Sequence, residues 1–594
     1  MTVSPPPSQS LRGLSPVGPL RSRRGCTTCK IRKVKCGEEK PHCIRCTSTG
    51  RKCEYQGQIA GTFSSASSSP TISIHDTSLS FLPNTVWRER RAFAYYFQQA
   101  APFVGGELDV DFWRTTIPQV CRSEPAVWDA IISISALFES PEPCPDLVLS
   151  RRRDVQHTLN QNHRDAMGWY SRSVSAVRRR IERGDVDIFV GLISCVLFIC
   201  IEALQGGSDE AVRLYAQGVH LIFALRAQIA AGAVSATKAF LLEDIIVPVF
   251  VRLGEIAMSD PANLLVALLP TTQRTSTQEF PSLRAAREAI VLLLADVQLL
   301  ERNYEEHLTE TNSFDVPDEL LTRQTLLSER ILNWHTAFTN LINSLRSKDV
   351  LSPQQISSST LLSACHKTLF IQLSICLSPF QTTPDAYEPL FQTIVDESRM
   401  VLDGSGRSDG TQPPFTYDIS VGLPLWFTSL RCREPTLRRA ALALLRRAPQ
   451  ILGFYKSADG VMFAEGVMML EEAYAQAMNA QRADDSVPEL TNDLPIQAID
   501  AGTTPDTNPV PIPKAMAMSI NTNKPTALLI PEEARMGPVR MFRASEGFPP
   551  ETPDDEIAKW SHSPDQGFLR FSRNKLDPAT NTWHRVHGYM PIMM

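Results

Sequence analysis

Six cysteines between residues 26 and 53 follow the spacing C-x2-C-x6-C-x6-C-x2-C-x6-C, in which the unit C-x2-C-x6-C occurs twice. A segment this short buries too little apolar surface to fold by itself. Clustered thiols in a reduced environment bind metal more often than they pair with each other. The spacing therefore predicts a metal-stabilised module whose ligands are Cys26, Cys29, Cys36, Cys43, Cys46 and Cys53.

Ligand counting indicates which metal centre the repeat can form. Structural zinc takes four ligands in a tetrahedron, and thiolate is a preferred donor. Three cysteines per unit cannot complete one site, whereas six thiolates can hold two zinc ions if two of them bridge both metals. The symmetry of the repeat nominates its equivalent first members, Cys26 and Cys43, as the bridges. The predicted cofactor is two Zn²⁺ ions.

Other readings of the cysteines and of the longest apolar run are less favoured. A disulfide knot would need an oxidising compartment, and the N-terminus MTVSPPPSQS lacks the apolar region of a secretory signal. His42 could replace one thiolate, but it is adjacent to Cys43, so simultaneous ligation is awkward. The run at 188–201 is shorter than the roughly 20 residues of a membrane span. It predicts a buried helix, and no membrane partner is expected.

The charge of the chain is unevenly distributed. The net charge is −5, yet residues 21–55 carry +8 and the remainder −13, which indicates a polyanion partner for the basic module. KIRKVK, after Cys29, predicts about two helical turns with Ile31 and Val34 facing the small core. An ordinary solvated face is the alternative for its basic residues. Those predicted to project outward are Lys30, Arg32, Lys33 and Lys35.

Residues 26–55, CTTCKIRKVKCGEEKPHCIRCTSTGRKCEY, resemble the fungal binuclear zinc-cluster (Zn2Cys6) DNA-binding domains. The resemblance implies two short helices joined by a loop containing Pro41, with the first helix in the DNA major groove, typically at a CGG triplet. Gly37 departs from the family, which most often has Asp there. Matched by position to the family motif, Lys33 is the expected base contact and Arg32 its partner. The resemblance implies mainly phosphate contacts for Lys30, Lys35, Arg45, Arg51 and Lys52.

Residues 86–481 show helical periodicity nearly throughout, which predicts a large all-α domain. Ser208 is expected to cap a helix whose apolar stripe runs through Ala211, Tyr215, Val219, Ile222 and Leu225. Another helix is expected to begin near Pro435. The segments ERRAFAYYFQQAAPFV, DFWRTTIPQVCRSEPAVWDAI, LFICIEALQGG and GLPLWFTSLRCREPTLRRAALALL resemble the effector domain of fungal zinc-cluster regulators.

The predicted organisation is a small Zn2Cys6 domain and a large all-α regulatory domain, with disordered linkers and tail. The Ser-rich linker contains no apolar heptads, so no dimerising coiled coil is expected. The predicted parts are a disordered N-terminus (1–20), the Zn2Cys6 domain (21–56), a flexible linker (57–82), the all-α domain (83–482), a largely disordered segment (483–548) and a C-terminal segment with a small hairpin about DPATN (549–594).

Several short motifs that resemble functional sites are expected to be structural. Gly404–Gly410 lacks the spacing of a phosphate loop and predicts a loop. Cys365 and His366 are expected to be buried structural residues, because adjacent helical residues do not face one another. His584 and His587 lack visible partner ligands. The arginine runs at 178–180, 438–439 and 446–447 are expected to form solvated helix faces.

Together these features predict a nuclear, zinc-dependent, sequence-specific DNA-binding regulator of RNA polymerase II transcription. No catalytic signature is present, so an enzyme is not expected. The expected partners are double-stranded DNA and the transcription machinery or coregulators, and a homodimer would not use an evident coiled coil. The expected targets are metabolic or secondary-metabolite genes with GC-rich elements. Two alternatives remain open: an enzyme or ligand-sensing helical domain, and a zinc module for protein interaction.

Overall fold

The computed structural model divides the chain into two compact units, Met1–Pro83 and Asn84–Met594, each described here by itself. The structure describes residues 26–39, 42–50, 53, 87–106, 108–140, 160–185, 187–256, 268, 279–311, 314–406, 411–484, 530–537, 539–543, 547–548, 557–558 and 567–592. Arg51 and Lys52, the N-terminus, the Ser-rich linker and part of the predicted loop Gly404–Gly410 lie outside these residues.

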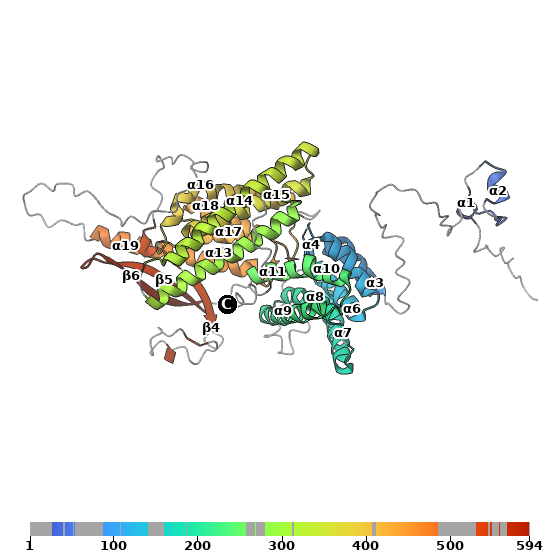
Figure 1. The fold of residues 1–594 in the computed structure, drawn as a ribbon, viewed down its shortest axis with the longest axis horizontal. Coiled ribbons are helices and arrows are strands. Elements are labelled where there is room, and N and C mark those ends of the chain that lie inside the picture. The colour runs from blue at the N-terminus through green and yellow to red at the C-terminus, as the bar shows by residue number, and fades with distance from the viewer. Residues whose placement is uncertain are drawn as a thin grey trace, which may run out of the picture. The chain divides into compact units, whose positions relative to one another are not determined.

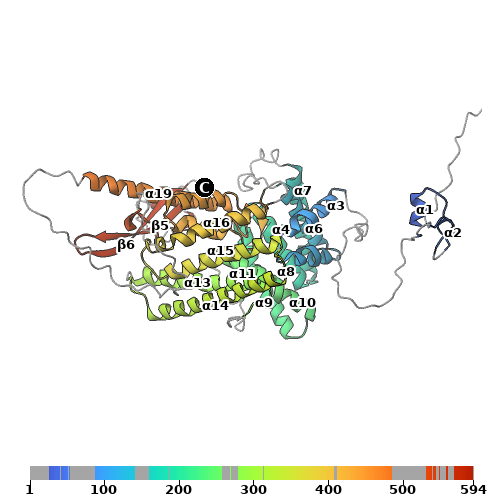
Figure 2. The ribbon, with the colours of Figure 1, turned by 90° about the horizontal axis from the view of Figure 1, so that it is seen from above.

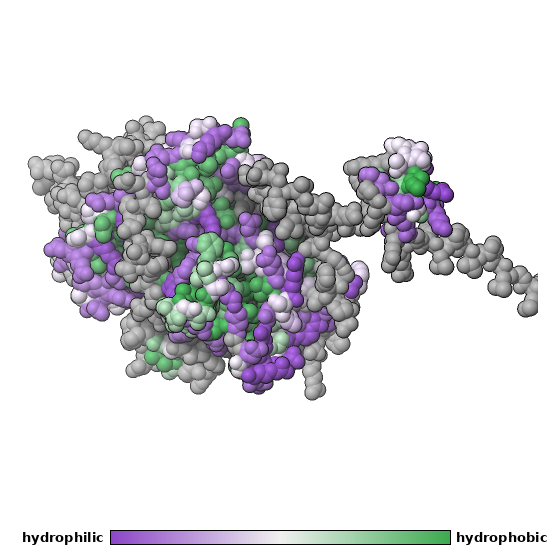
Figure 3. Space-filling model, turned by 45° about the vertical axis from the view of Figure 1, so that its right-hand side comes forward, coloured by the Kyte–Doolittle hydropathy of each residue, from purple (hydrophilic) through white to green (hydrophobic). Residues whose placement is uncertain are grey.

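The first unit contains two short helices, α1 (Thr27–Ile31) and α2 (Ile44–Thr47), which pack against each other. Its buried cluster consists of the six cysteines, with Val34 partly buried against them. Ile31 and Ile44 are 76% and 64% exposed, and Figure 3 shows a small apolar patch among polar side chains on this unit. In its described part, therefore, sulfur takes the place of a hydrocarbon core.

The N-terminal half of the second unit is a group of helices around α6, which contacts α3, α7 and α8 (Figure 1). Side chains cap the starts of two of them: Asn160 accepts from the His163 N–H before α7, and Asp187 from the Phe189 N–H before α8. The elements are α3 (Trp87–Tyr95), η3 (Tyr96–Ala100), α4 (Ala101–Val104), η4 (Phe112–Thr116), α5 (Ile117–Cys121), α6 (Pro125–Glu139), α7 (Gln161–Arg183), α8 (Ile188–Leu204), α9 (Ser208–Ala230), α10 (Ala236–Leu241), η7 (Leu242–Ile246) and α11 (Val247–Ile256).

Three long helices, α13, α14 and α15, begin the second half and lie side by side (Figure 2). A capping box between Ser352 and Gln355 starts α15. Trp334 is buried where the three helices meet, and its indole N–H donates to the Ala286 carbonyl. The elements are α13 (Leu283–Thr311), α14 (Asp318–Lys348), α15 (Pro353–Ile375), η9 (Thr383–Tyr387), α16 (Glu388–Gly404), α17 (Gly422–Arg431), α18 (Pro435–Leu445) and α19 (Ser457–Asp484).

Two small sheets accompany the helices. Strands β1 (Phe415–Thr416), β2 (Ile451–Leu452) and β3 (Tyr455–Lys456) form one, and β4 (Val539–Arg543), β5 (Gly567–Asp577) and β6 (Thr582–Ile592) form an antiparallel sheet in that order. β5 and β6 flank the DPATN turn, and β5 packs with Met536 against α19. The 3-10 turn η11 (Glu532–Ala534) lies between α19 and β5.

The predicted fold class, a small zinc-cluster domain and a large helical domain, is confirmed, with the two sheets as additions to the helical unit. Within the segment expected to be largely disordered, residues 530–537 and 539–543 are placed and packed. The Arg535 guanidinium, 2% exposed, bonds Asp385 through both terminal nitrogens (2.7 and 2.6 Å), and Glu532 accepts from the backbone N–H groups of Gln381 and Thr382. Long-range polar pairs such as these cannot be read from local composition.

Helix α9 confirms its predicted apolar stripe, since all five residues are buried. The predicted cap is wrong: α9 begins at Ser208 after Gly207, and the Ser208 hydroxyl donates to the Phe454 carbonyl at 3.0 Å. Helix α18 begins at Pro435 as expected. In the described part of the chain, no helix is both long and apolar enough to cross a bilayer.

Buried ion pairs stabilise the helical unit. One of them shows that the predicted solvated face at Arg438–Arg439 is wrong for Arg438. Arg438 is 1% exposed and donates to Glu471 in α19, whereas Arg439 is exposed and pairs with Glu472. His366 is buried as predicted, and its ring stacks on Trp334. A second set of ion pairs joins five side chains from four segments of the chain, of which all but Glu288 are buried: Asp109, Arg252, Arg287, Glu288 and Asp418.

Candidate metal centre and nucleic-acid interface

The two cysteine repeats adopt matching local structures. Cys26 and Cys43 have extended backbones and immediately precede α1 and α2, which carry Cys29 and Cys46. At the first helix, the Cys26 Sγ caps the N-terminus by accepting from the Cys29 N–H at 3.4 Å. All six predicted ligand cysteines are buried, none more than 8% exposed.

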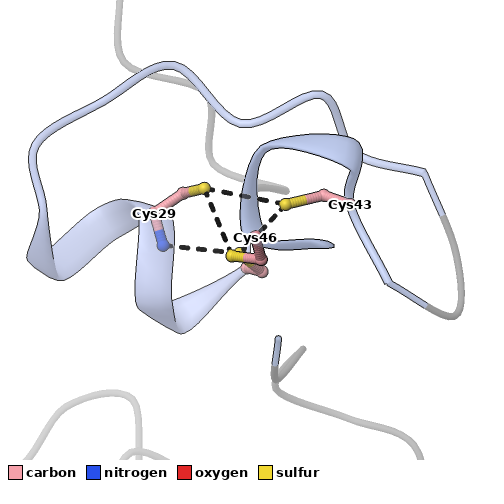
Figure 4. Close-up of side chains that lie close together, drawn as sticks. Cys29, Cys43 and Cys46 are labelled. Atoms are coloured by element: carbon pink, nitrogen blue, oxygen red, sulfur yellow. Dashed lines mark hydrogen bonds between the residues drawn. The ribbon is translucent and has the colours of Figure 1, made fainter. Parts of the chain in front are cut away.

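Four sulfur atoms from the two helices converge. The Sγ atoms of Cys26, Cys29, Cys43 and Cys46 all lie within 4.8 Å of one another. Each Sγ of the first pair lies 3.7 to 3.8 Å from each Sγ of the second. Figure 4 shows the Cys29, Cys43 and Cys46 side chains pointing toward one another. Such an all-sulfur set suits a soft, tetrahedral ion such as zinc.

The third cysteine of each repeat lies against the first. The Cys26 N–H donates to the Cys36 Sγ at 3.3 Å, and the Cys43 N–H donates to the Cys53 Sγ at 3.2 Å. The sequence repeat is therefore also a structural repeat, in which Cys26 and Cys43 each contact the third cysteine of their own unit and the thiols of the other unit.

The surroundings favour negative charge on the first cysteine of each repeat. Burial raises the pKa of Cys43, but hydrogen bonds from the Cys46 N–H and from neighbouring thiols outweigh it and lower this pKa to about 6. At Cys26 burial is likewise outweighed, chiefly by the Cys29 N–H, so its pKa is lowered. Burial raises the pKa of Cys29 and Cys53. Zinc ligation needs thiolates, so these N–H groups help to prepare the site.

The basic segment after Cys29 differs from the predicted two-turn helix. Helix α1 ends at Ile31, and Lys33 has a left-handed backbone with φ of 56°. The Val34 N–H donates to the Cys29 carbonyl and the Lys33 N–H to the Lys30 carbonyl, both at 3.1 Å, which is a Schellman ending. Val34 packs on the cysteines as predicted, but the prediction for Ile31 is wrong because the early turn leaves it exposed.

The basic side chains predicted to meet DNA lie on the surface wherever the structure describes them. The Arg32 guanidinium donates to the Thr49 hydroxyl at 3.4 Å, which ties the segment to the end of α2. A non-glycine residue in the left-handed region costs about 1 kcal/mol, so the Lys33 backbone is strained. The exposed set is Lys30, Arg32, Lys33, Lys35 and Arg45.

Two residues near the cysteines, His42 and Glu39, make hydrogen bonds that the sequence did not predict. His42 lies outside the four-sulfur group, and its Nδ1 is 3.4 Å from the Cys53 carbonyl oxygen. The Glu39 carboxylate accepts from the Ile44 N–H at 3.2 Å at the start of α2. Sequence reasoning missed this contact, and an acidic residue shortly before a helix was its only signal.

Comparison with known families agrees with this geometry. Residues 24–60 match the fungal Zn(2)-Cys(6) binuclear cluster domain, and residues 91–463 match the fungal specific transcription factor domain. The second match covers more than half of the chain. The protein therefore belongs to the fungal Zn(2)-Cys(6) transcription regulators, a family of regulators and not of enzymes.

Similar curated proteins are also fungal regulators. The aspercryptin biosynthesis cluster-specific transcription regulator atnN of Emericella nidulans is 31% identical over 255 residues, which is 37% of this chain and 36% of that protein. The transcriptional regulatory protein moc3 of Schizosaccharomyces pombe is 38% identical over 68 residues, 11% of this chain and 13% of its own. The matched segments thus span about a third or less of these relatives. No solved structure matches.

Membership of the family implies zinc binding, DNA binding and a nuclear location. The four converging thiols provide a structural basis for the zinc, and the exposed basic segment beside them is a surface suited to DNA.

Proposed function

We propose that this protein binds two Zn²⁺ ions through six thiolates and uses the resulting module to recognise specific DNA sequences and regulate RNA polymerase II transcription. The observation that carries the proposal is the group of four converging sulfur atoms. In addition, the Cys36 and Cys53 thiols accept hydrogen bonds from the N–H groups of Cys26 and Cys43, the first cysteines of the two repeats. Cys26 and Cys43 are the bridging ligands, because each lies against the third cysteine of its own repeat and also against thiols of the other repeat. The other four cysteines complete the two tetrahedra.

The DNA is read by the segment between the second and third cysteines. Lys33 contacts base edges at a CGG-type GC-rich element, since a lysine can donate to guanine O6 and N7 in the major groove. Its strained backbone, held by the Schellman turn at the end of α1, fixes where the side chain leaves the module. Arg32 lies beside it, and phosphate contacts come mainly from Lys30, Lys35, Arg45, Arg51 and Lys52.

The helical unit connects DNA binding to regulation by contacting coregulators or the transcription machinery. The similarity to the aspercryptin regulator, whose name specifies a biosynthesis cluster, supports a secondary-metabolite gene set as the target. The protein acts in the nucleus, consistent with its family.

A lysine substitution tests the base contact. Lys33→Ala in the full zinc-loaded chain should weaken binding to the best CGG-containing duplex by about 1–3 kcal/mol and relax the preference at that base pair. The matched control is Lys35→Ala, another exposed cation on the same segment. It should weaken all sequences alike and reduce the salt slope by about one unit. Fluorescence anisotropy on matched and scrambled duplexes measures both, and an equal loss on both duplexes with Lys33→Ala would refute the base contact.

Metal counting tests the bridged cluster separately. Elemental analysis of the full chain should give two zinc ions per protein, and one ion would contradict the bridging arrangement. Two ions with no measurable affinity for any duplex would favour the alternative, a zinc module for protein interaction attached to a ligand-sensing helical domain.

A further inference from the structure

Helix α14 has an outer face that is nearly free of charge. Its inner side is buried against α13 and α15, and Figure 2 shows the helix along an edge of the unit. Between Leu321 and Asn343 the exposed side chains are three leucines, four threonines, three asparagines and one glutamate, Glu329. The leucines, Leu321, Leu326 and Leu332, are 42%, 56% and 44% exposed.

The threonines make this face more apolar than its composition suggests. The hydroxyls of Thr322, Thr325 and Thr336 donate to carbonyls one turn earlier in the same helix, at 2.8, 3.0 and 3.0 Å. With these hydroxyls satisfied inside the helix, the threonines offer methyl groups to a partner. The result is a surface with little charge over about six helical turns, and depletion of charge is typical of the centre of protein interfaces.

The ends of the helix indicate which partner fits. Asp318 and Glu319 are exposed at the start of α14, and Arg346 and Lys348 are exposed at its end, where they outweigh Asp349. If two copies of α14 pack antiparallel about a two-fold axis, the acidic end of each faces the basic end of the other. A neutral centre is also required, because a two-fold axis brings each face against itself and an acidic surface would repel its copy.

We propose that the outer face of α14 is a homodimer interface in which two copies of the chain pack these helices antiparallel, with Asn333 near the two-fold axis. This placement sets Glu329 against the uncharged region around Ala337 and not against another glutamate. Dimerisation through the helical unit needs no coiled coil after the zinc cluster. It brings two copies of the DNA-binding module together through a domain distant from it in sequence.

Solution mass tests the interface. The full zinc-loaded chain should sediment as a dimer at micromolar concentration, and the pair Leu326→Lys with Leu332→Lys should sediment as a monomer. Ile181→Lys, which places the same charge on the 60% exposed Ile181 of α7, should remain dimeric. A monomeric unaltered chain, or a dimer that persists in the double-lysine variant, overturns the proposal.

A charge exchange tests the antiparallel direction and remains informative if the lysine variants fold poorly. One variant carries Asp318→Lys and Glu319→Lys, and a second carries Arg346→Glu and Lys348→Glu. Each alone places like charges at both ends of the pair and should raise the dimer Kd at least about tenfold. Mixed at equal amounts they should form a heterodimer, because every end then meets the opposite charge. Folded variants that stay monomeric when mixed contradict the antiparallel arrangement.

Discussion

The two units of this protein reach stability by different means. In the described part of the zinc-cluster unit the buried residues are cysteines, and both of its exposed isoleucines could have contributed to a core but do not. The helical unit instead buries extensive apolar clusters and adds ion pairs whose members are nearly inaccessible to water. A short segment cannot offset its chain entropy by apolar burial, so metal ligation supplies what the longer segment obtains from packing.

Removal of zinc is the change with the largest expected effect. It should unfold the zinc-cluster unit and leave the helical unit folded. Structural zinc contributes roughly 10–16 kcal/mol in small zinc domains, so a strong chelator should unfold the first unit and abolish DNA binding. All eight tryptophans lie beyond residue 83, so tryptophan fluorescence reports on the helical unit alone. That signal and the helical circular dichroism should be unchanged.

Single substitutions provide the control for metal removal. Cys43→Ala should reproduce the effect of chelation, whereas Cys121→Ala, at a buried cysteine of the helical unit, should leave zinc content and DNA binding intact. Loss of the tryptophan signal on chelation would mean that the units are not independent.

The same contrast explains how much could be predicted from the sequence. The cysteine spacing was sufficient to predict that the thiols of the two repeats come together, because ligand number and type follow from zinc chemistry, and four of the six do converge. The stripe on α9 was equally readable, since burial of one helix face has a fixed period. The early end of α1 was not readable, because a lysine and not a glycine occupies the left-handed position, and the exposure of Ile31 follows from that turn.

Burial of charge depends on partners distant in sequence, and this limited the prediction for the helical unit. Arg438 and Arg439 look alike in the sequence, yet only Arg438 faces Glu471 in the next long helix. The packing of Arg535 on Asp385 is another such case, because its two members are 150 positions apart in the sequence. Periodicity identifies elements, whereas the pairing of elements is set by the tertiary fold.

Loss of a buried carboxylate is the next largest expected effect. Glu471 is 0% exposed and accepts from Arg433 at 2.8 Å, from Arg438 at 2.6 Å and from the Met536 N–H at 2.8 Å. Glu471→Gln leaves two guanidinium groups buried without their counter-charge, so the free energy of unfolding should fall by about 3–5 kcal/mol. Urea unfolding followed by tryptophan fluorescence measures this.

The neighbouring residue is a matched control for that substitution. Glu472 pairs with the half-exposed Arg439, so Glu472→Gln should cost about 0.2–1 kcal/mol. If both variants lost the same stability, burial of the Glu471 pairs would not be what stabilises this region. Neither variant should alter zinc content.

Acidification should destabilise the helical unit through His366. Burial, with His335 and Lys367 nearby, lowers the pKa of His366 to about 3. The unfolded state, with a pKa near 6.5, takes up a proton below that pH while the folded state does not. The stability linked to this histidine is therefore complete above about pH 6.5 and declines by about 1.4 kcal/mol per pH unit as the pH falls toward 3.

The variant His366→Phe keeps the ring that stacks on Trp334 and removes the titration. Its stability should fall less steeply between pH 6 and pH 4 than that of the unaltered chain, as measured by urea unfolding at each pH. Identical slopes for the two proteins would show that His366 is protonated in the folded state.

The smallest expected effect is the truncation of an exposed isoleucine in the zinc-cluster unit. The same truncation at a buried isoleucine of the helical unit should cost much more stability. Ile31→Ala in the zinc-loaded chain removes a side chain that is 76% exposed, so the stability of the first unit should change by less than about 0.5 kcal/mol. Zinc retention against a competing chromophoric chelator measures it. The same truncation at Ile371, which is 0% exposed in α15, should cost the helical unit about 2–5 kcal/mol. A large loss of zinc affinity with Ile31→Ala would show that apolar packing also holds the zinc cluster, and the contrast between the two units would then be one of degree.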